Sequence, residues 1–173
     1  GKIPEAYGVK EIWDYDDIQT ALTGPPSDVY FIRLELRAAD GRLLSLNSYA
    51  EPLRNDVAGA SHSWNRSGTY QAPDMTLLNQ LPLVDLEVTQ PAFKKASGKN
   101  ILTCRVSNPT GNIAYAVELK AYTGSDRRTL VAPVIYDDNL FTLFPGESRD
   151  IDISYNRSDL PGKAFVAVSC YNN

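Results

Sequence analysis

The sequence predicts an all-β protein. From Thr76 onward it contains about seven short runs in which apolar and polar residues alternate, which is the two-residue period of a half-buried β-strand. Turn-forming residues separate these runs at regular spacing. No 10–15-residue helical pattern alternates with the strands, which excludes an α/β barrel. Together these observations predict an immunoglobulin-like β-sandwich over residues 76–173.

The strands of this sandwich are expected where the alternation is clearest. Pro91 is expected to end the first of them, and residues 94–99 then form a polar turn. The next strands follow Asn-, Gly- and Pro-containing turns. The segments are Val84–Val88, Leu102–Val106, Tyr115–Ala121, Ile151–Tyr155 and Phe165–Tyr171.

The stretch Val131–Ser148, VAPVIYDDNLFTLFPGES, supplies the remaining strands of the sandwich. Two apolar runs flank an acidic turn, Tyr136–Asn139, and a Pro145-Gly146 turn leads into the next strand. The runs are too apolar for a solvated loop, and the acidic residues between them are too polar to be buried without partners. We therefore expect two strands of the sandwich joined by a tight turn.

A hairpin precedes the sandwich. Val29–Arg37 alternates strictly, so we expect a half-buried strand with one apolar face, and Asp40-Gly41 is a hairpin-turn signal before the return strand Leu43–Tyr49. The apolar face consists of Tyr30, Ile32, Leu34 and Leu36. Because a two-stranded hairpin is not stable alone, it either docks on the sandwich or is the tail of a preceding sandwich. A polar loop follows, and we place the domain boundary between residues 1–75 and 76–173.

Composition excludes several classes of function. The chain has 173 residues and a net charge of −4, with no run of lysine or arginine, so nucleic acid and membranes are not expected partners. The start, GKIPEAYGVK, lacks the apolar core of a signal peptide, and Gly1 indicates a cut segment. One histidine and two distant cysteines are too few for a zinc site. We expect no metal and no cofactor.

Four stretches of the chain stand out together by their order and spacing. They are YFIRLEL from Tyr30 with the turn and strand after it, LNQLPLV from Leu78, VAPVIYDDN from Val131 and LFPGES from Leu143. Together they resemble the C-terminal immunoglobulin-like domains of family 2 glycoside hydrolases, in the branch of β-mannosidase and exo-β-D-glucosaminidase. The chain departs from the family at Tyr136, where a tryptophan is usual, and at Asp137, where a serine is usual.

The resemblance implies a non-catalytic accessory region of an exported enzyme, periplasmic or extracellular. Family 2 enzymes resemble retaining glycosidases whose two catalytic glutamates lie on a (β/α)8 barrel, which takes ~250 residues. This chain would then be the end of the fourth domain and all of the fifth. We expect its partners to be the catalytic barrel and the other domains of the parent chain. The alternatives are an independent carbohydrate-binding module and a protein-binding adhesion-type sandwich, and an open strand edge could also produce a dimer.

The acidic turn is one candidate functional site. Tyr136, Asp137, Asp138 and Asn139 would reach toward the sugar site of the barrel or make an interdomain contact. The alternative, which we favour, is a solvated turn whose side chains bond their own backbone. Calcium would need more ligands than this turn supplies.

Aromatic residues and cysteines complete the candidates. Trp13, Trp64 and Tyr70 would stack on sugars, although they lie in irregular segments, and we favour a packing role. A disulfide between Cys104 and Cys170 would close about 66 residues and add roughly 4 kcal/mol. We favour free thiols, because the two strands need not be neighbours. We expect no catalytic residue in this chain.

Overall fold

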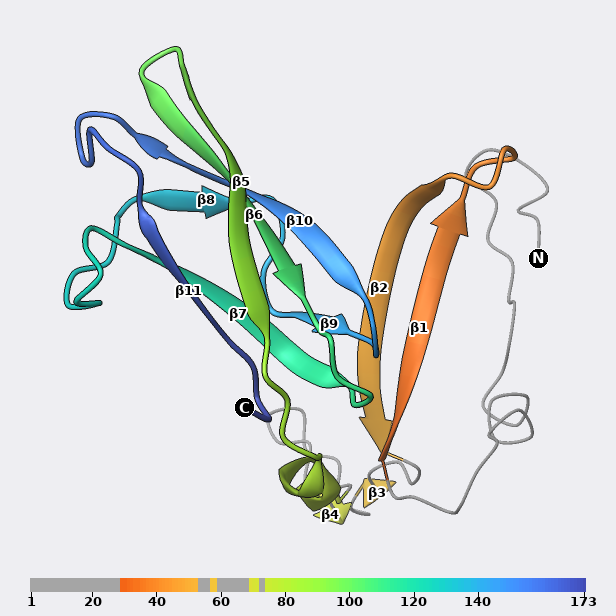
Figure 1. The fold of residues 1–173 in the computed structure, drawn as a ribbon. Coiled ribbons are helices and arrows are strands. Elements are labelled where there is room, and N and C mark those ends of the chain that lie inside the picture. The colour runs from red at the N-terminus through yellow and green to blue at the C-terminus, as the bar shows by residue number, and fades with distance from the viewer. Residues whose placement is uncertain (1–28, 53–56, 59–68, 72–73) are drawn as a thin grey trace.

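A computed structural model describes residues 29–52, 57–58, 69–71 and 74–173 and confirms the all-β prediction. Seven strands of the described part form a two-sheet sandwich, and a two-stranded hairpin stands beside it (Figure 1). No helix among the described residues is long and apolar enough to cross a membrane. The elements are β1 (Val29–Arg37), β2 (Leu43–Pro52), β3 (Val57–Ala58), β4 (Thr69–Gln71), the 3-10 helix η1 (Thr76–Gln80), β5 (Glu87–Ala96), β6 (Lys99–Ser107), β7 (Ala114–Tyr122), β8 (Val134–Tyr136), β9 (Phe141–Leu143), β10 (Ser148–Asn156) and β11 (Phe165–Ser169).

The sandwich consists of a four-stranded and a three-stranded antiparallel sheet. Their strand orders are β5-β6-β10-β8 and β11-β7-β9, and β1 pairs with β2 as a separate hairpin. β3 and β4 pair with each other. The hairpin lies beside β9, and its Asp40-Gly41 tip points away from the sandwich (Figure 1). The hairpin therefore contacts the sandwich near one end of the two sheets.

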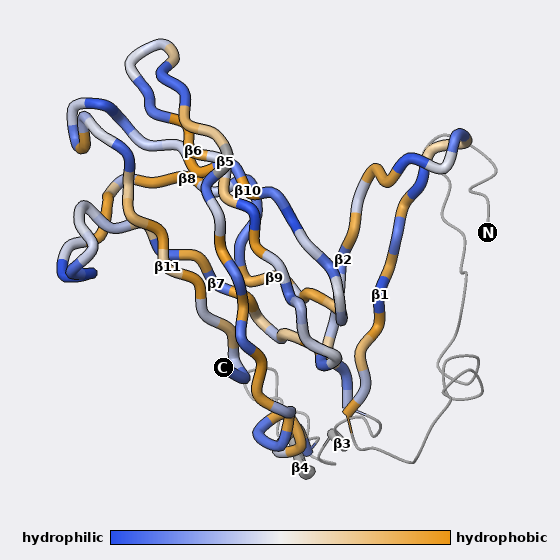
Figure 2. Tube along the Cα trace, viewed as in Figure 1, coloured by the Kyte–Doolittle hydropathy of each residue, from blue (hydrophilic) through white to orange (hydrophobic). Residues whose placement is uncertain are grey.

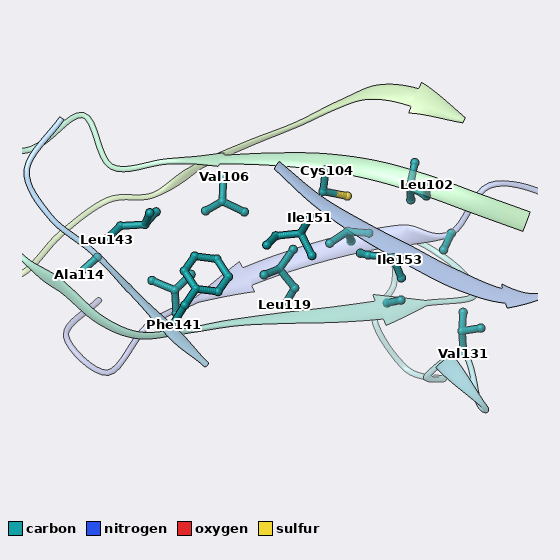
Figure 3. Close-up of a cluster of buried hydrophobic side chains, with 14 of the residues drawn as sticks. Leu102, Cys104, Val106, Ala114, Leu119, Val131, Phe141, Leu143, Ile151 and Ile153 are labelled. Atoms are coloured by element: carbon teal, nitrogen blue, oxygen red, sulfur yellow. The ribbon is translucent and has the colours of Figure 1, made fainter. Parts of the chain in front are cut away.

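The core lies between the two sheets and is built from the predicted alternation. On β6, Leu102, Cys104 and Val106 are fully buried, while the residues between them are more exposed. They face side chains from β7, β9 and β10, including Leu119, Phe141, Ile151 and Ile153 (Figure 3). Such close-packed apolar contact is the main source of stability of the sandwich.

The prediction for the first strand of the sandwich was wrong. We expected a strand over Val84–Val88 ending at Pro91, but β5 starts at Glu87 and continues through Pro91 to Ala96. The pairing with β6 shifts register between Thr89 and Ala92, so Pro91 lies in a bulge on an edge strand. Proline lacks a backbone N–H and is tolerated at such positions. The expected polar turn shortens to Ser97 and Gly98, both at positive φ, as two-residue hairpin turns require.

The prediction for Tyr115 was also wrong. Regular alternation over the predicted segment Tyr115–Ala121 would place Tyr115 on the same face as Val117, Leu119 and Ala121, which are buried. The pairing of β7 with β9 shifts register between Ala114 and Val117, and Ala116 has a φ of 50°. This bulge inserts one residue, so Ala114 is buried and Tyr115 lies on the outer face.

The Val131–Ser148 stretch gives the two expected strands, but they join different sheets. β8 pairs with β10 in the four-stranded sheet, and β9 pairs with β7 in the three-stranded sheet. The acidic turn therefore crosses from one sheet to the other. The Pro145-Gly146 turn is confirmed, since the N–H of Glu147 donates to the carbonyl of Phe144 and β10 begins at Ser148.

The hairpin forms as predicted, and side chains of its mixed face contact the sandwich. Apolar and polar residues alternate along β1 and β2 (Figure 2). On the apolar face Tyr30 and Ile32 are half-buried, while Leu34 and Leu36 are 55% and 58% exposed. Phe31 and Arg33, on the opposite face, contact the sandwich. The sequence pattern identified the two faces, but it could not show which one meets the sandwich.

Candidate functional site: the hairpin–sandwich interface

Two of the four stretches that carry the family resemblance, the first and the fourth, meet where the hairpin contacts the sandwich. We call this the hairpin–sandwich interface and define it by Phe31, Arg33, Tyr115, Phe144 and Glu147. Phe31 and Arg33 come from β1, Tyr115 from the bulge in β7, and the other two from the turn between β9 and β10. The interface therefore joins elements that are up to 114 residues apart in sequence.

One half of this interface is aromatic. The rings of Phe31 and Tyr115 meet edge to face with centroids 5.5 Å apart, and Tyr115 meets Tyr171 in the same way at 5.8 Å. The hydroxyl of Tyr171 donates to the side-chain oxygen of Asn79, which lies in η1. Each edge-to-face pair contributes ~0.5–1.5 kcal/mol beyond its area burial. This row of rings connects the hairpin to the segment before β5.

The other half of the interface is ionic. The guanidinium of Arg33 donates to Glu147 and to Glu35, and it lies 5.3 Å from the ring centroid of Phe144. The hydrogen bond to Glu147 is the main cause that raises the pKa of Arg33. The second carboxylate oxygen of Glu147 accepts the N–H of Phe144 at 3.0 Å. Glu147 thus holds both its own turn and the hairpin.

Asn108 fixes the turn that carries Phe144 and Glu147. Its side chain is 1% exposed, and its amide donates to the carbonyls of Asn112, Leu143 and Phe144 at 2.8–3.4 Å. Its backbone N–H donates to the carbonyl of Glu147, and its carbonyl accepts from Gly146. A buried asparagine whose hydrogen bonds are all satisfied makes a local structure unique. Asn108 therefore positions the ionic half of the interface by holding the turn that carries Phe144 and Glu147.

Asn172 fixes the aromatic half in a similar way. Its side-chain amide donates to the carbonyls of Pro82 and Ile113 at 2.7 and 2.9 Å, and its side-chain oxygen accepts the N–H of Tyr115 at 3.1 Å. Its carbonyl accepts the N–H of Val84. These bonds tie the segment before β5 to the start of β7.

The acidic turn lies at the end of a groove beside this interface. Asp138 forms an ion pair with Arg149, whose guanidinium lies 4.7 Å from the ring centroid of Phe141. The groove has a volume of about 460 Å³ and lies between Leu43–Leu46 of β2 and the Asp138, Glu147 and Arg149 side of the sandwich. Its charged side chains are all in ion pairs, Arg33 with Glu147, Asp138 with Arg149, and Asp150 with Arg105 outside the lining, so the groove offers little free charge to a ligand.

Two other side chains of the turn complete the edge of β7. The side-chain oxygen of Asn139 accepts the N–H of Leu119 at 2.8 Å, and its amide donates to the carbonyl of Leu119 at 3.2 Å. The hydroxyl of Tyr136 accepts the N–H of Ala121 at 3.0 Å, and burial raises the pKa of Tyr136. Because the chain crosses between sheets here, these side chains replace a neighbouring strand. An interdomain contact through this turn stays a prediction.

The remaining candidates are separate from the interface or outside the described residues. Trp13 and Trp64 lie outside the described residues, as does the side chain of Tyr70, whose backbone is in β4. Cys104 and Cys170 are free thiols, and burial raises the pKa of Cys104 to about 11, which keeps it protonated and poorly reactive near neutral pH. Within the described ranges, no three His, Cys, Asp or Glu side chains are grouped to hold a metal ion.

Local sequence patterns do not single out the residues that build the interface. The patterns around Arg33, Glu147, Asn108 and Asn172 are typical of exposed strand or turn positions, while the alternation in β7 placed Tyr115 on the core face. The only signal was indirect, because the resemblance included the stretches that contain Arg33 and Glu147 without pairing them. A contact across 114 residues has no local periodicity to reveal it.

Comparison with known proteins identifies the family. A family model described as the exo-β-D-glucosaminidase Ig-fold domain matches residues 64–173, more than half of the chain. The chain belongs to this family. The predicted resemblance to family 2 glycoside hydrolases is therefore confirmed on its exo-β-D-glucosaminidase side, while the β-mannosidase side stays a prediction.

Relatives of this domain occur within much longer proteins. The chain is 29% identical to an exo-β-D-glucosaminidase of Streptomyces avermitilis, covering 88% of this chain and 18% of that protein. It is 28% identical to an exo-β-D-glucosaminidase of Amycolatopsis orientalis, covering 88% and 15%. The crystal structure of an exo-chitosanase from Amycolatopsis orientalis superposes with a TM-score of 0.75 at 26% identity, covering 88% of this chain and 19% of that one. The chain thus spans less than a fifth of the length of these relatives.

Proposed function

We propose that this chain is a non-catalytic accessory region of a family 2 glycoside hydrolase of the exo-β-D-glucosaminidase type. Its role is structural: it holds the hairpin and the sandwich in a fixed relative position. The single observation that carries the proposal is the hairpin–sandwich interface, where Arg33, Glu147 and Phe144 form one charged and aromatic contact. The relatives that share this region are glucosaminidases by name and extend well beyond it.

We propose that the parent acts on β-D-glucosaminides in preference to β-D-mannosides. The names of the relatives support this choice, and one solved relative was captured in complex with PNP-β-D-glucosamine. A catalytic barrel elsewhere in the parent would supply the two carboxylates that retaining hydrolysis needs. The chain itself would contribute stability and domain position.

The acidic turn is the part of the sandwich best suited to contact the barrel or another domain of the parent. Three of its side chains bond to the strands beneath, which holds the turn rigid. Two large apolar side chains beside it face solvent, Ile135 at 62% and Leu140 at 67% exposure, and Leu140 has a φ of 59°. A left-handed leucine costs about 1–2 kcal/mol and persists only where neighbours hold it in place. Rigid, exposed apolar side chains are typical of contact surfaces.

A hydrolysis assay on the purified chain tests the proposal. We expect no release of nitrophenol from PNP-β-D-glucosamine or from the corresponding β-D-mannoside above the buffer rate. Release by the chain alone would overturn the non-catalytic assignment. In a parallel chitosan pull-down, retention that is lost in Trp64→Ala would instead favour an independent carbohydrate-binding module.

A further inference from the structure

We propose that the sandwich accepts an extended peptide strand in a lateral slot between β5 and β11. The strand would be apolar at alternate positions and acidic at one end. The slot has a volume of about 620 Å³ and lies on the opposite side of the sandwich from the acidic turn, since β8 and β9 are the other two edge strands. This inference does not depend on the proposed function.

At this slot the three-stranded sheet ends in β11, an edge strand with one unpaired side among the described residues. β5 and β11 are the edge strands on the same side of the two sheets, but the sheets have four and three strands. In the described residues, β11 pairs only with β7, so its other edge carries unpaired backbone groups. β11 has five residues, which corresponds to about 17 Å of extended chain. A peptide strand of similar length would extend the three-stranded sheet to four.

The slot is bounded at both ends, and its lining combines apolar side chains with Gln90, Arg127 and Lys163. At one end the N–H of Val84 donates to the carbonyl of Asn172 at 2.9 Å. At the other end the ammonium of Lys163 lies 3.4 Å from the carbonyl of Gln90. The walls between these ends come from Leu86 and Val88 on one side and from Val166 and Val168 on the other. Alternate apolar side chains of a docked strand would enter this space.

The edge of β11 lacks the features that normally prevent strand addition. Its sequence, FVAVS, contains no charge and no proline. Each other edge strand of the sandwich is protected, since β5 carries Pro91 in a bulge with Lys94 and Lys95, and β8 and β9 have only three residues each. Short strands, bulges, lysine and proline are the usual protection of sheet edges. β11 is therefore the edge of this sandwich that is open to β-augmentation.

The charges that line the slot favour an acidic end on the incoming strand. Arg127 and Lys163 both line the slot, and in the part of the chain that the structure describes no carboxylate lines it with them. Arg127 lies over the ring of Phe165 at 5.5 Å, and neither cation has an ion-pair partner among the described residues. An acidic end to the strand would compensate these two charges. A sugar fits less well, because the guanidinium covers the ring of Phe165, the only aromatic side chain among the described residues that line the slot.

A peptide titration followed by NMR tests this inference. The probe is Thr-Val-Thr-Val-Thr-Val-Asp-Glu, with one control that ends in Lys-Lys and another with proline at the fourth position. We expect saturable shifts of the amides of Phe165–Ser169 and Leu86–Val88 with the acidic probe alone. In the variant Arg127→Glu/Lys163→Glu, affinity for the acidic probe falls at least about tenfold and the Lys-Lys probe binds instead.

Matched controls make each outcome decisive. The variant Arg42→Glu/Lys95→Glu changes the net charge equally at exposed positions outside the slot, and it should bind the acidic probe as the unmodified chain does. The proposal is overturned by three results: no saturable shift at millimolar probe, equal affinity in both charge variants, or shifts outside the slot. Light scattering over a range of protein concentrations tests whether a second copy of the chain occupies the slot. A dimer that pairs through β11 without peptide would also overturn the proposal.

Discussion

Replacing Asn108 by alanine should lower the free energy of unfolding of the sandwich by about 3 kcal/mol, because one substitution removes several hydrogen bonds at a buried position. The carbonyls of Asn112, Leu143 and Phe144 lose the bond from the Asn108 amide, and the N–H and hydroxyl of Thr110 lose the bond to the Asn108 side-chain oxygen. Chemical denaturation measures this change. The substitution should also loosen the turn that carries Phe144 and Glu147.

Asn47→Ala is the matched control for this prediction. Asn47 lies on β2, is exposed, and has no side-chain hydrogen bond within the described part of the chain. Its replacement should change stability by less than about 0.5 kcal/mol. An equal effect of the two substitutions would contradict the positioning role of Asn108.

Replacing Arg33 by alanine should release the hairpin from the sandwich without unfolding the core. The side chains of Arg33 and Glu147 are 29% and 27% exposed, so their ion pair is partly shielded from water. With the loss of the contact to Phe144, we expect a cost of ~1–3 kcal/mol, which is roughly 5- to 150-fold faster hydrogen exchange of the β1 and β2 amides. The amides of β6 should keep their protection.

A double-mutant cycle separates this contact from other effects. Glu147→Gln keeps an acceptor for the N–H of Phe144 and weakens only the bond to Arg33. The combined Arg33→Ala/Glu147→Gln chain should therefore lose less than the sum of the single changes. Arg37→Ala is the control on the same strand, since Arg37 is half exposed and bonds within the hairpin. Additive effects for Arg33 and Glu147 would show that the two side chains are not coupled.

Strand positions and buried faces could largely be predicted from the sequence. The alternation at Leu102, Cys104 and Val106 identified a core face because burial between two sheets demands a two-residue period. Asp40-Gly41 identified the hairpin because that turn requires residues that adopt positive φ, and Gly41 has a φ of 86°. Local patterns of this kind depend only on neighbouring residues.

The interface could not be predicted in the same way. The bulge at Ala116 reverses the face on which Tyr115 lies, and nothing in AYAVELKAY marks where the extra residue enters. The hairpin has an apolar face and a mixed face, and local hydropathy favoured burial of the apolar one. The sandwich instead offers Glu147, Phe144 and Tyr115, which complement Arg33 and Phe31. That complementarity exists only after folding.

The structural role of the chain is tested most directly by domain exchange. This chain would replace the corresponding region of the Amycolatopsis orientalis exo-β-D-glucosaminidase, and hydrolysis of PNP-β-D-glucosamine would be measured. We expect a folded chimera with a kcat close to that of the unmodified enzyme, and a lower melting temperature when the chimera carries Asn108→Ala. A folded chimera without activity, or one whose melting temperature does not change with Asn108→Ala, would contradict the structural role.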